Sequence, residues 1–286
     1  MESTSNGVRS NCKIAFFGTP NFAVVILKEL KKKGIGPGLV ITAPDKPRGR
    51  GMKLTPPPVK VWAEDNSIEY IQPEKLDSEF IEKLKIENYK LFVVAAYGKI
   101  LRQEILDIPK YGTLNVHPSL LPKLRGASPI EGAVLEGEKE TGVSIMILDS
   151  EMDHGPILAQ EKIKLNGQEK APELENKLAK IGGKLLAQTI PKWIKEDIKK
   201  IEQNHSLATF TKKITKDDGL IDPNGDSEIN WRKFRAFYGW PGIYFFINGE
   251  RIIVKDASLE NGIFKIKRVL PEGRKEVDYE IFKKSI

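Results

Sequence analysis

A short apolar run near the N-terminus, residues 13–17, ends in a sharp turn and leads directly into a helical pattern. Gly18-Thr19-Pro20 interrupts the run, and the apolar residues that follow it recur at helical spacing. An apolar run without alternation is typical of a strand that is buried on both faces. The chain therefore begins with a strand, a turn and a helix, the unit from which sheets covered by helices are built.

Two further apolar runs, at residues 39–42 and 91–96, repeat the buried-strand pattern, and helical patterns at residues 58–65 and 77–86 lie between them. Strands that alternate with helices favour parallel pairing through right-handed crossovers. We therefore expect an α/β fold with a doubly wound parallel sheet through about residue 160. A long helical pattern at residues 171–201 follows it.

The pattern changes to a β type after about residue 203. Asn248-Gly249 stands between two strand-like runs and is typical of a tight hairpin turn, and Asn261-Gly262 precedes a further strand-like run at residues 263–269. We expect three parts: a disordered tail at residues 1–11, an α/β domain at residues 12–202, and a small β domain at residues 203–286.

The composition excludes several classes of protein. The 286 residues are 40% hydrophobic, and no apolar stretch approaches the ~20 residues that span a bilayer, so we expect no membrane partner. The polar N-terminus lacks the layout of a signal peptide, and the single cysteine fits a reducing compartment, so we expect a cytoplasmic protein. The net charge of +7 is compatible with an anionic partner such as nucleic acid.

The turn at Gly18 raises the question of a nucleotide site. A dinucleotide fingerprint needs glycines at G-x-G-x-x-G spacing, and Gly18-Thr19-Pro20-Asn21-Phe22 lacks the later glycines. We interpret Gly18 as a structural turn, with nucleotide binding as the alternative.

The most informative polar residues are Asn115 and His117. Residues two apart in an extended segment project from the same face, so this spacing places an amide beside an imidazole. An amide donor can stabilise a developing oxyanion, and an imidazole can take up or deliver a proton near neutral pH. Both residues are therefore candidate catalytic groups, and a buried structural histidine beside a turn asparagine is the alternative.

A second polar cluster, residues 149–155, follows another apolar run. One of its carboxylates, from Asp149, Glu151 or Asp153, can pair with His117 and stabilise the protonated imidazole. A zinc site of His117, Asp153 and His154 is an alternative, although adjacent Asp and His do not give a familiar ligand spacing. We expect a site that needs no metal.

These motifs together resemble those of the folate-dependent formyltransferases. The resemblance rests on Asn115-x-His117-Pro118-Ser119-Leu120-Leu121-Pro122, on Arg125-Gly126-Ala127 and on Asp153-x-Gly155-Pro156. It implies a Rossmann-like formyltransferase domain followed by a small OB-like β-barrel domain. It also implies that an amine takes a formyl group from 10-formyltetrahydrofolate, with Asn115, His117 and Asp153 as the catalytic trio.

The same resemblance implies that two segments hold the reduced folate. One segment would bind it through Ser119, Leu120, Leu121 and Pro122. The other would line the pterin pocket with Tyr97, Gly98, Ile100 and Leu101. Ordinary core packing is the alternative for the apolar residues among them.

A basic segment bears on the identity of the acceptor amine. Residues 44–58 contain five prolines and two glycines, so we expect an exposed loop without regular structure. Its cations, which suit contacts with phosphates, are Lys46, Arg48, Arg50 and Lys53. The segment resembles the tRNA-contacting insertion of family members that act on methionyl-tRNA, and residues 213–222, 240–242 and 271–275 resemble their second domain. A solvated basic connector is the alternative.

The resemblance thus implies a monomeric enzyme of translation initiation that formylates the methionine carried by initiator tRNA. An amino-sugar nucleotide N-formyltransferase would share the catalytic trio but would not need the basic segment or the β domain. A non-enzymatic tRNA-binding relative would have little reason to keep Asn115, His117 and Asp153.

Overall fold

The computed structural model of the chain describes residues 12–49 and 51–285, so the expected tail at residues 1–11 lies outside the described residues. The chain forms two compact units. The first runs through Arg125 and also contains Gly142–Lys162 and Asn176–Thr209, and the second contains Gly126–Thr141, Ile163–Glu175 and Phe210–Ile286.

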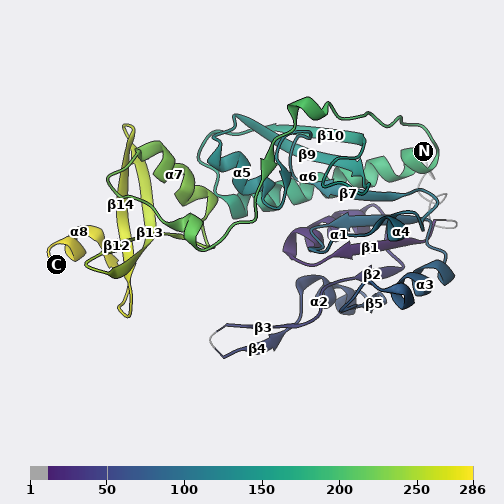
Figure 1. Cartoon of the computed structure of the whole chain (residues 1–286), viewed down its shortest axis with the longest axis horizontal. Helices are drawn as coiled ribbons and strands as arrows, with labels where there is room; N and C mark the ends of the chain where they lie inside the picture. The colour runs from purple at the N-terminus through teal and green to yellow at the C-terminus, as the bar shows by residue number, and fades with distance from the viewer. Residues whose placement is uncertain (1–11, 50, 286) are drawn as a thin grey trace. The chain divides into compact units, whose positions relative to one another are not determined.

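A seven-stranded sheet in the order β10-β9-β7-β6-β1-β2-β5 forms the framework of the α/β part (Figure 1). Its strands are β1 (Ile14–Gly18), β2 (Leu39–Ile41), β5 (Tyr70–Ile71), β6 (Leu91–Ala95), β7 (Thr113–His117), β9 (Glu140–Ile147) and β10 (Ile157–Lys164). The helices of this part of the chain are α1 (Asn21–Lys32), α2 (Pro58–Asp65), α3 (Ser78–Ile86), α4 (Gln103–Leu106), α5 (Pro129–Leu135) and α6 (Ala171–Ile194). The doubly wound Rossmann-like domain expected from the sequence is confirmed.

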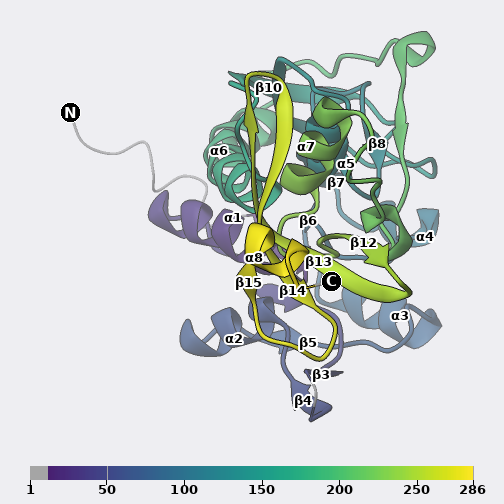
Figure 2. The ribbon, with the colours of Figure 1, turned by 90° about the vertical axis from the view of Figure 1, so that its left-hand side faces the viewer.

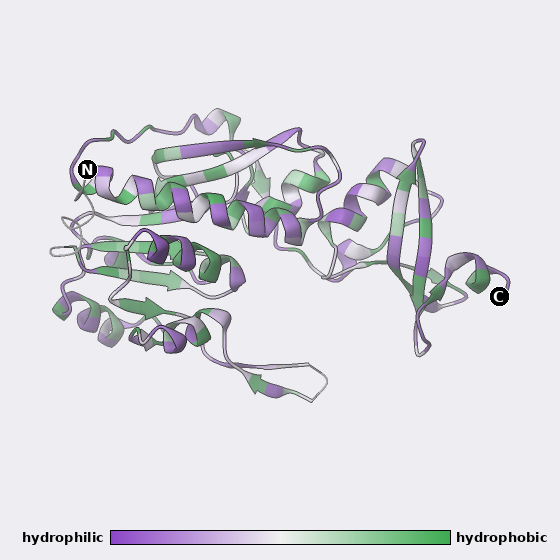
Figure 3. Cartoon of the chain, turned by 180° about the vertical axis from the view of Figure 1, so that it is seen from behind, coloured by the Kyte–Doolittle hydropathy of each residue, from purple (hydrophilic) through white to green (hydrophobic). Residues whose placement is uncertain are grey.

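The central strands are apolar on both faces because helices cover both. One face of the sheet packs with α3 and α4 in a single apolar cluster, to which β1 contributes Phe17 and β6 contributes Phe92. On the other face, α6 approaches β7 and β9 closely, since a Cβ on Gly182 would lie 2.7 Å from a methyl carbon of Val116. Figure 3 shows the central strands of this sheet as largely hydrophobic, whereas the edge strand β10 is polar over much of its length and α6 carries both polar and apolar residues.

One strand departs from the expected parallel pattern. Strands β1, β2, β5, β6 and β7 pair in parallel, but β9 pairs antiparallel to β7, with His117 opposite Ser144. The apolar run of β9 has the same composition as its neighbours, so the sequence pattern does not reveal its direction.

The long helix is shorter than its periodicity predicts. α6 ends at Ile194, and Glu196 takes a left-handed conformation with a φ of 60°. The N–H of Asp197 then bonds to the carbonyl of Lys192 at 2.8 Å, which closes the last turn. Ile201, expected within the helix, instead forms an isolated antiparallel bridge with Ile157.

The expectation that residues 44–58 lack regular structure is wrong. β3 (Lys46–Arg48) pairs antiparallel with β4 (Lys53–Thr55), so the segment is a two-stranded hairpin, visible below α2 in Figure 1. Pro47 lies opposite Leu54. A two-stranded ribbon consists of edge strands only, where proline is tolerated because its missing N–H need not join a ladder.

The C-terminal part is a small antiparallel β domain, as expected. Its four-stranded sheet has the order β12 (Ile243–Ile247), β13 (Glu250–Glu260), β14 (Ile263–Pro271) and β15 (Val277–Asp278). Its helices are α7 (Ser227–Ala236), which packs against β13 and β14, and α8 (Tyr279–Lys283), as Figure 2 also shows. The shorter elements before it are β8 (Arg125–Gly126), β11 (Phe210–Thr211) and the 3-10 turns His205–Leu207 and Asp217–Gly219.

The predicted hairpin turn at Asn248-Gly249 is confirmed, and Asn261-Gly262 forms a second one. Asn248 and Gly249 have φ values of 50° and 82° between β12 and β13. Asn261 and Gly262 have φ values of 51° and 78° between β13 and β14. Positive φ at both central residues is the type I′ geometry that these residue types favour.

Within the described part of the chain, none of the helices combines the length and the apolar character that crossing a bilayer requires.

Candidate active site

Strand β7 carries two of the predicted catalytic residues. Asn115 and His117 lie two positions apart at its carboxyl end and are buried, with 9% and 4% of their surface exposed. Asn115 stands in register with Val94 of β6, whose side chain belongs to the apolar cluster under α3 and α4. The pleat of the strand therefore brings both polar side chains to one face, as predicted.

Both nitrogens of the His117 ring face oxygen atoms. Nε2 lies 3.0 Å from the carbonyl oxygen of Leu124, and Nδ1 lies 3.5 Å from Oδ1 of Asp153. A carbonyl oxygen can only accept a hydrogen bond, so Nε2 carries a hydrogen. In the neutral imidazole the lone pair then lies on Nδ1, on the side of the Asp153 carboxylate.

The loop that follows β9 holds Asp153 in an unusual backbone conformation. Asp153 has a φ of 50°, in the left-handed region that aspartate tolerates better than most residues. Gly155 follows two residues later. A Cβ on Gly155 would lie 2.1 Å from the carbonyl oxygen of Ile147, so only glycine fits there. The Asp-x-Gly spacing noted in the sequence therefore has a steric basis.

A buried glutamine joins this loop to the segment after β7. Gln203 donates through Nε2 to the carbonyl oxygens of Asp153 at 2.9 Å and Gly155 at 2.7 Å. Its Oε1 accepts from Nε and Nη2 of Arg125, at 3.2 and 2.7 Å. Arg125 follows Leu124, whose carbonyl faces His117, so these contacts link the surroundings of both ring nitrogens.

Asp149 and His154 form a separate pair. Nδ1 of His154 lies 2.8 Å from Oδ2 of Asp149, and the His154 ring stacks on that of His205 at 4.0 Å between centroids. Asp153, not Asp149, is thus the carboxylate beside His117. In residues 12–49 and 51–285, no group of three or more His, Cys, Asp or Glu side chains has an arrangement that could hold a metal ion.

The candidate folate residues lie after the carboxyl ends of two adjacent strands, β6 and β7, where ligands bind in open α/β sheets. Tyr97 is buried, with its ring edge against Phe17, and Leu101 packs into the cluster under α3 and α4. Gly98 has a φ of 84°, and Ile100 is largely exposed.

Tyr97 has a feature that suits a polar ligand. Its hydroxyl oxygen is buried and has no hydrogen-bond partner within the described part of the protein. Burial raises the pKa of Tyr97 to about 12, so the hydroxyl keeps its proton and can donate.

The segment after His117 is tied to β9. Ser119 donates through Oγ to the carbonyl of Lys123 at 2.6 Å, and its own carbonyl accepts from Oγ of Ser144 at 2.7 Å. The N–H of Leu121 donates to the same Ser144 oxygen at 3.1 Å. Leu121 is buried, while Leu120 and Pro122 are half-buried.

The four candidate tRNA-binding cations belong to the hairpin segment. Lys46 on β3 and Lys53 on β4 are exposed, Arg48 contributes its backbone to β3, and Arg50 lies outside the described residues. At the base of the hairpin, Asp45 accepts from Gln72 at 2.7 Å and from Lys60 at 2.9 Å. Both hydrogen bonds lower the pKa of Asp45, and the one from Gln72 has the larger effect.

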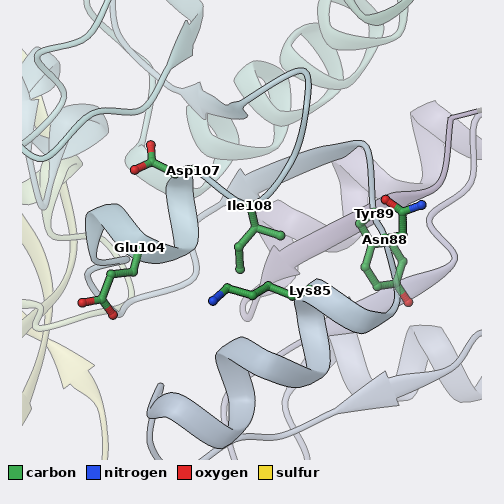
Figure 4. A pocket seen from close by; sticks show the side chains of 6 residues that line it. All are labelled: Lys85, Asn88, Tyr89, Glu104, Asp107 and Ile108. Carbon is green, nitrogen blue, oxygen red and sulfur yellow. The ribbon is translucent and has the colours of Figure 1, made fainter.

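A cavity of about 310 Å³ lies away from these residues, between the end of α3 and α4 (Figure 4). Its lining residues are Lys85, Asn88, Tyr89, Glu104, Asp107 and Ile108. Lys85, Asn88 and Tyr89 precede β6, whereas Asn115 and His117 lie at the carboxyl end of the neighbouring strand β7. None of the predicted site residues lines this cavity.

Gln203, Leu124 and Thr209 contact the site although the sequence pattern does not single them out. Leu124 has a φ of 58°, and its N–H donates to Oγ1 of Thr209 at 2.9 Å. The signal that could have found Leu124 is its place next to the Arg125-Gly126 motif, and no comparable signal marks Gln203.

Comparisons with known proteins agree with this geometry. Residues 12–190 match the family described as Formyl transferase, and residues 213–273 match Formyl transferase, C-terminal domain. The methionyl-tRNA formyltransferase of Thermodesulfovibrio yellowstonii is 44% identical over 270 residues, covering 92% of this chain and 87% of its own. That of Chloroflexus aurantiacus is 45% identical over 247 residues, covering 86% of this chain and 80% of its own.

Solved structures show the same fold at lower sequence identity. An N-formyltransferase from Helicobacter canadensis, in complex with folinic acid and dTDP-3-aminofucose, superposes with a TM-score of 0.66 at 21% identity, over 87% of this chain and 88% of its own. Methionyl-tRNA formyltransferase from Clostridium thermocellum superposes with a TM-score of 0.60 at 18% identity, over 93% of this chain and 99% of its own.

Proposed function

The chain belongs to the formyl transferase family, and on that premise we propose that it transfers a formyl group from 10-formyltetrahydrofolate to the amino group of methionine esterified to initiator tRNA. The observation that carries the proposal is the contact of His117 Nδ1 with Asp153 at the end of β7, beside the Asn115 amide. The choice of methionyl-tRNA as the acceptor rests on the two methionyl-tRNA formyltransferases described above, which are 44% and 45% identical to this chain over 92% and 86% of its length.

The reaction needs an oxyanion donor and a proton carrier. The neutral amine attacks the formyl carbon, a carbon–nitrogen bond forms, and the formyl oxygen gains negative charge. Asn115 can donate its side-chain N–H to that oxygen, and its burial strengthens the interaction by excluding water. When the bond to the folate nitrogen breaks, that nitrogen must receive a proton.

His117 moves this proton at Nδ1. The attacking amine loses a proton as it becomes an amide, and the departing folate nitrogen gains one, so a single imidazole can balance both transfers. Asp153 stabilises the imidazolium that exists between them, because its carboxylate lies beside Nδ1. The carbonyl of Leu124 keeps Nε2 protonated throughout.

Reduced folate would occupy the region after the ends of β6 and β7. The buried hydroxyl of Tyr97 could donate to the polar edge of a pterin, and the segment Ser119–Pro122, which follows His117 in the chain, could contribute apolar side chains. We propose that Gly98, Ile100 and Leu101 complete this region. The proton-transfer chemistry uses no Lewis acid, so we propose a reaction without a metal.

The hairpin of β3 and β4 would contact tRNA phosphates. Lys46 and Lys53 are exposed, and Arg48 and Arg50 lie between them in the sequence, so four cations are available on one short segment. We further propose that the C-terminal β domain, residues 203–286, contributes to tRNA binding, and that the enzyme acts as a monomer in the cytoplasm, where charged tRNA and folate are present.

An amino-sugar nucleotide is the second candidate acceptor, because the Helicobacter canadensis enzyme of the same fold was solved with dTDP-3-aminofucose. The single diphosphate of such an acceptor requires fewer cations than the hairpin segment carries, whereas the phosphate backbone of tRNA can use all four. The trio also argues against a non-enzymatic tRNA-binding role, since phosphate binding requires neither His117 nor Asp153.

A parallel acceptor assay tests the proposal. The protein is incubated with 10-formyltetrahydrofolate and either methionyl initiator tRNA or dTDP-amino sugars, and the acceptors are analysed by mass spectrometry. Formyl transfer to methionine alone is expected. Preferential formylation of the amino sugar would contradict the proposed acceptor, and formylation of neither would contradict the proposed activity.

A further inference from the structure

We infer that Gln203 is a positioning residue for the proposed reaction, because its side-chain amide holds the backbone that presents the Asp153 carboxylate to His117. The inference rests on the function proposed above. It extends the site from the trio to the segment 203–209, which lies far from the trio in the sequence.

Both amide hydrogens of Gln203 are directed at the Asp153 loop. Nε2 donates to the carbonyl oxygens of Asp153 and Gly155, at 2.9 and 2.7 Å, and Gln203 is buried. Asp153 has a left-handed φ of 50°, a conformation that persists only where the surroundings restrain it. Gln203 supplies that restraint on both sides of His154.

The orientation of the Gln203 amide is fixed by Arg125. The guanidinium can only donate, and it contacts Oε1 of Gln203 through two nitrogens at 3.2 and 2.7 Å. The carbonyls of Asp153 and Gly155 can only accept, so they must face Nε2. Arg125 is buried, with 3% of its surface exposed, and a buried charge requires hydrogen-bond partners of this kind.

The same segment restrains the other side of the imidazole. Thr209 accepts from the N–H of Leu124 through Oγ1 and from the N–H of Arg125 through its carbonyl, both at 2.9 Å. Leu124 has a φ of 58°, which is strained for a bulky residue, and its carbonyl faces Nε2 of His117. Gln203 and Thr209 therefore restrain two residues with left-handed backbones, Asp153 and Leu124. The oxygen atoms of those two residues face the two ring nitrogens of His117.

Gln203→Glu tests whether Gln203 positions the Asp153 loop, because it removes the amide donors with little change in the size of the side chain. The carboxylate still accepts from Arg125, but it cannot donate to Asp153 or Gly155 and instead repels their carbonyl oxygens. We expect kcat to fall about tenfold or more, since a shift of about 1 Å in a reacting group can cost a hundredfold. The KM for methionyl-tRNA and for folate should stay within about twofold, because Gln203 is buried and its polar atoms bond to Arg125, Asp153 and Gly155.

A double-variant comparison tests whether the effect passes through Asp153. If Gln203 acts by placing that carboxylate, Gln203→Glu should lower kcat by no more than about twofold in an Asp153→Asn background. The inference is overturned if Gln203→Glu has wild-type kcat, or if it causes the same loss in both backgrounds. A wild-type protein that formylates nothing would instead contradict the proposed function.

Two further variants control for folding. Trp193→Phe removes a side-chain hydrogen bond to the carbonyl of Tyr111, away from the site, and should leave kcat unchanged at a comparable loss of thermal stability. If Gln203→Glu does not fold, Gln203→Met replaces it, since it removes both donors to the Asp153 loop with little change in side-chain length. A normal kcat for folded Gln203→Met would then overturn the inference.

Discussion

Nδ1 of His117 lies 3.5 Å from Oδ1 of Asp153, at a point where strand β7 ends and the loop after β9 passes its edge. The pair depends on sheet order, because β9 lies next to β7 and runs antiparallel to it. A carboxylate is therefore present where an imidazolium would form, in a site that is largely closed to water.

Asp153→Asn should lower turnover while the protein stays folded. Asparagine tolerates the left-handed backbone of this position, so the loop keeps its path, but a neutral amide cannot stabilise an imidazolium. The matched control is Asp149→Asn, which weakens only the pair with His154 and should retain turnover. The reverse result in a steady-state assay would assign the role to Asp149.

Asn115→Ala should reduce kcat roughly a hundredfold or more, the usual effect of removing one oxyanion donor. Substrate binding should change less than turnover, because the interaction strengthens only as the formyl oxygen gains charge. Steady-state kinetics with a circular dichroism check of folding would measure this. A folded variant with wild-type kcat would show that another group stabilises the oxyanion.

Replacing Lys46, Arg48, Arg50 and Lys53 together with alanine should weaken the use of methionyl-tRNA and flatten its salt dependence. Each lost phosphate contact lowers the slope of log affinity against log salt by roughly 0.7 to 0.9. The control replaces four exposed lysines of α6, namely Lys177, Lys180, Lys184 and Lys192, and so changes the net charge equally. If both variants lose the same slope, the hairpin is only a solvated basic connector.

Glu131→Gln should stabilise the protein at pH 7. Burial raises the pKa of Glu131, and burial followed by the charge of Glu131 raises that of Glu175. A carboxyl whose pKa is raised in the folded state contributes stability below its ordinary pKa of about 4.5, and this is lost as pH rises through the raised value.

The measurement for Glu131→Gln is thermal unfolding at pH 7 and pH 4. The gain should be clear at pH 7 and should shrink at pH 4, where the wild-type carboxyl is already protonated. The control is Glu173→Gln, at an exposed position of α6, which should change the midpoint little at either pH. If Glu131→Gln unfolded at a lower temperature than wild type at pH 7, the buried charge of Glu131 would not be destabilising, which would contradict this prediction.

Local patterns in the sequence predicted much of this fold because the physical rules behind them act over a few residues. Asn248-Gly249 identified a hairpin turn, and period-two alternation placed Asn115 and His117 on one face. A continuous apolar run identified β6 as a buried strand, although the same pattern in β9 gave no sign that β9 runs antiparallel.

The remaining features depend on contacts between distant segments. The hairpin of β3 and β4 was hidden by its prolines, which an edge ribbon tolerates. Gln203 reads as one polar residue in a polar stretch, and only the folded chain brings it to the carbonyls of Asp153 and Gly155. The strained φ of Leu124 likewise has no local sequence cause, since leucine avoids that region unless tertiary contacts impose it.

Single-turnover transfer of a labelled formyl group to methionyl initiator tRNA by wild-type enzyme and by His117→Ala tests the central claim most directly. We predict that wild type places the label on the methionine amino group, that the folded variant is slower by roughly a hundredfold or more, and that added imidazole restores part of the rate. Transfer by folded His117→Ala at the wild-type rate, with no response to imidazole, would contradict the claim that His117 carries the proton.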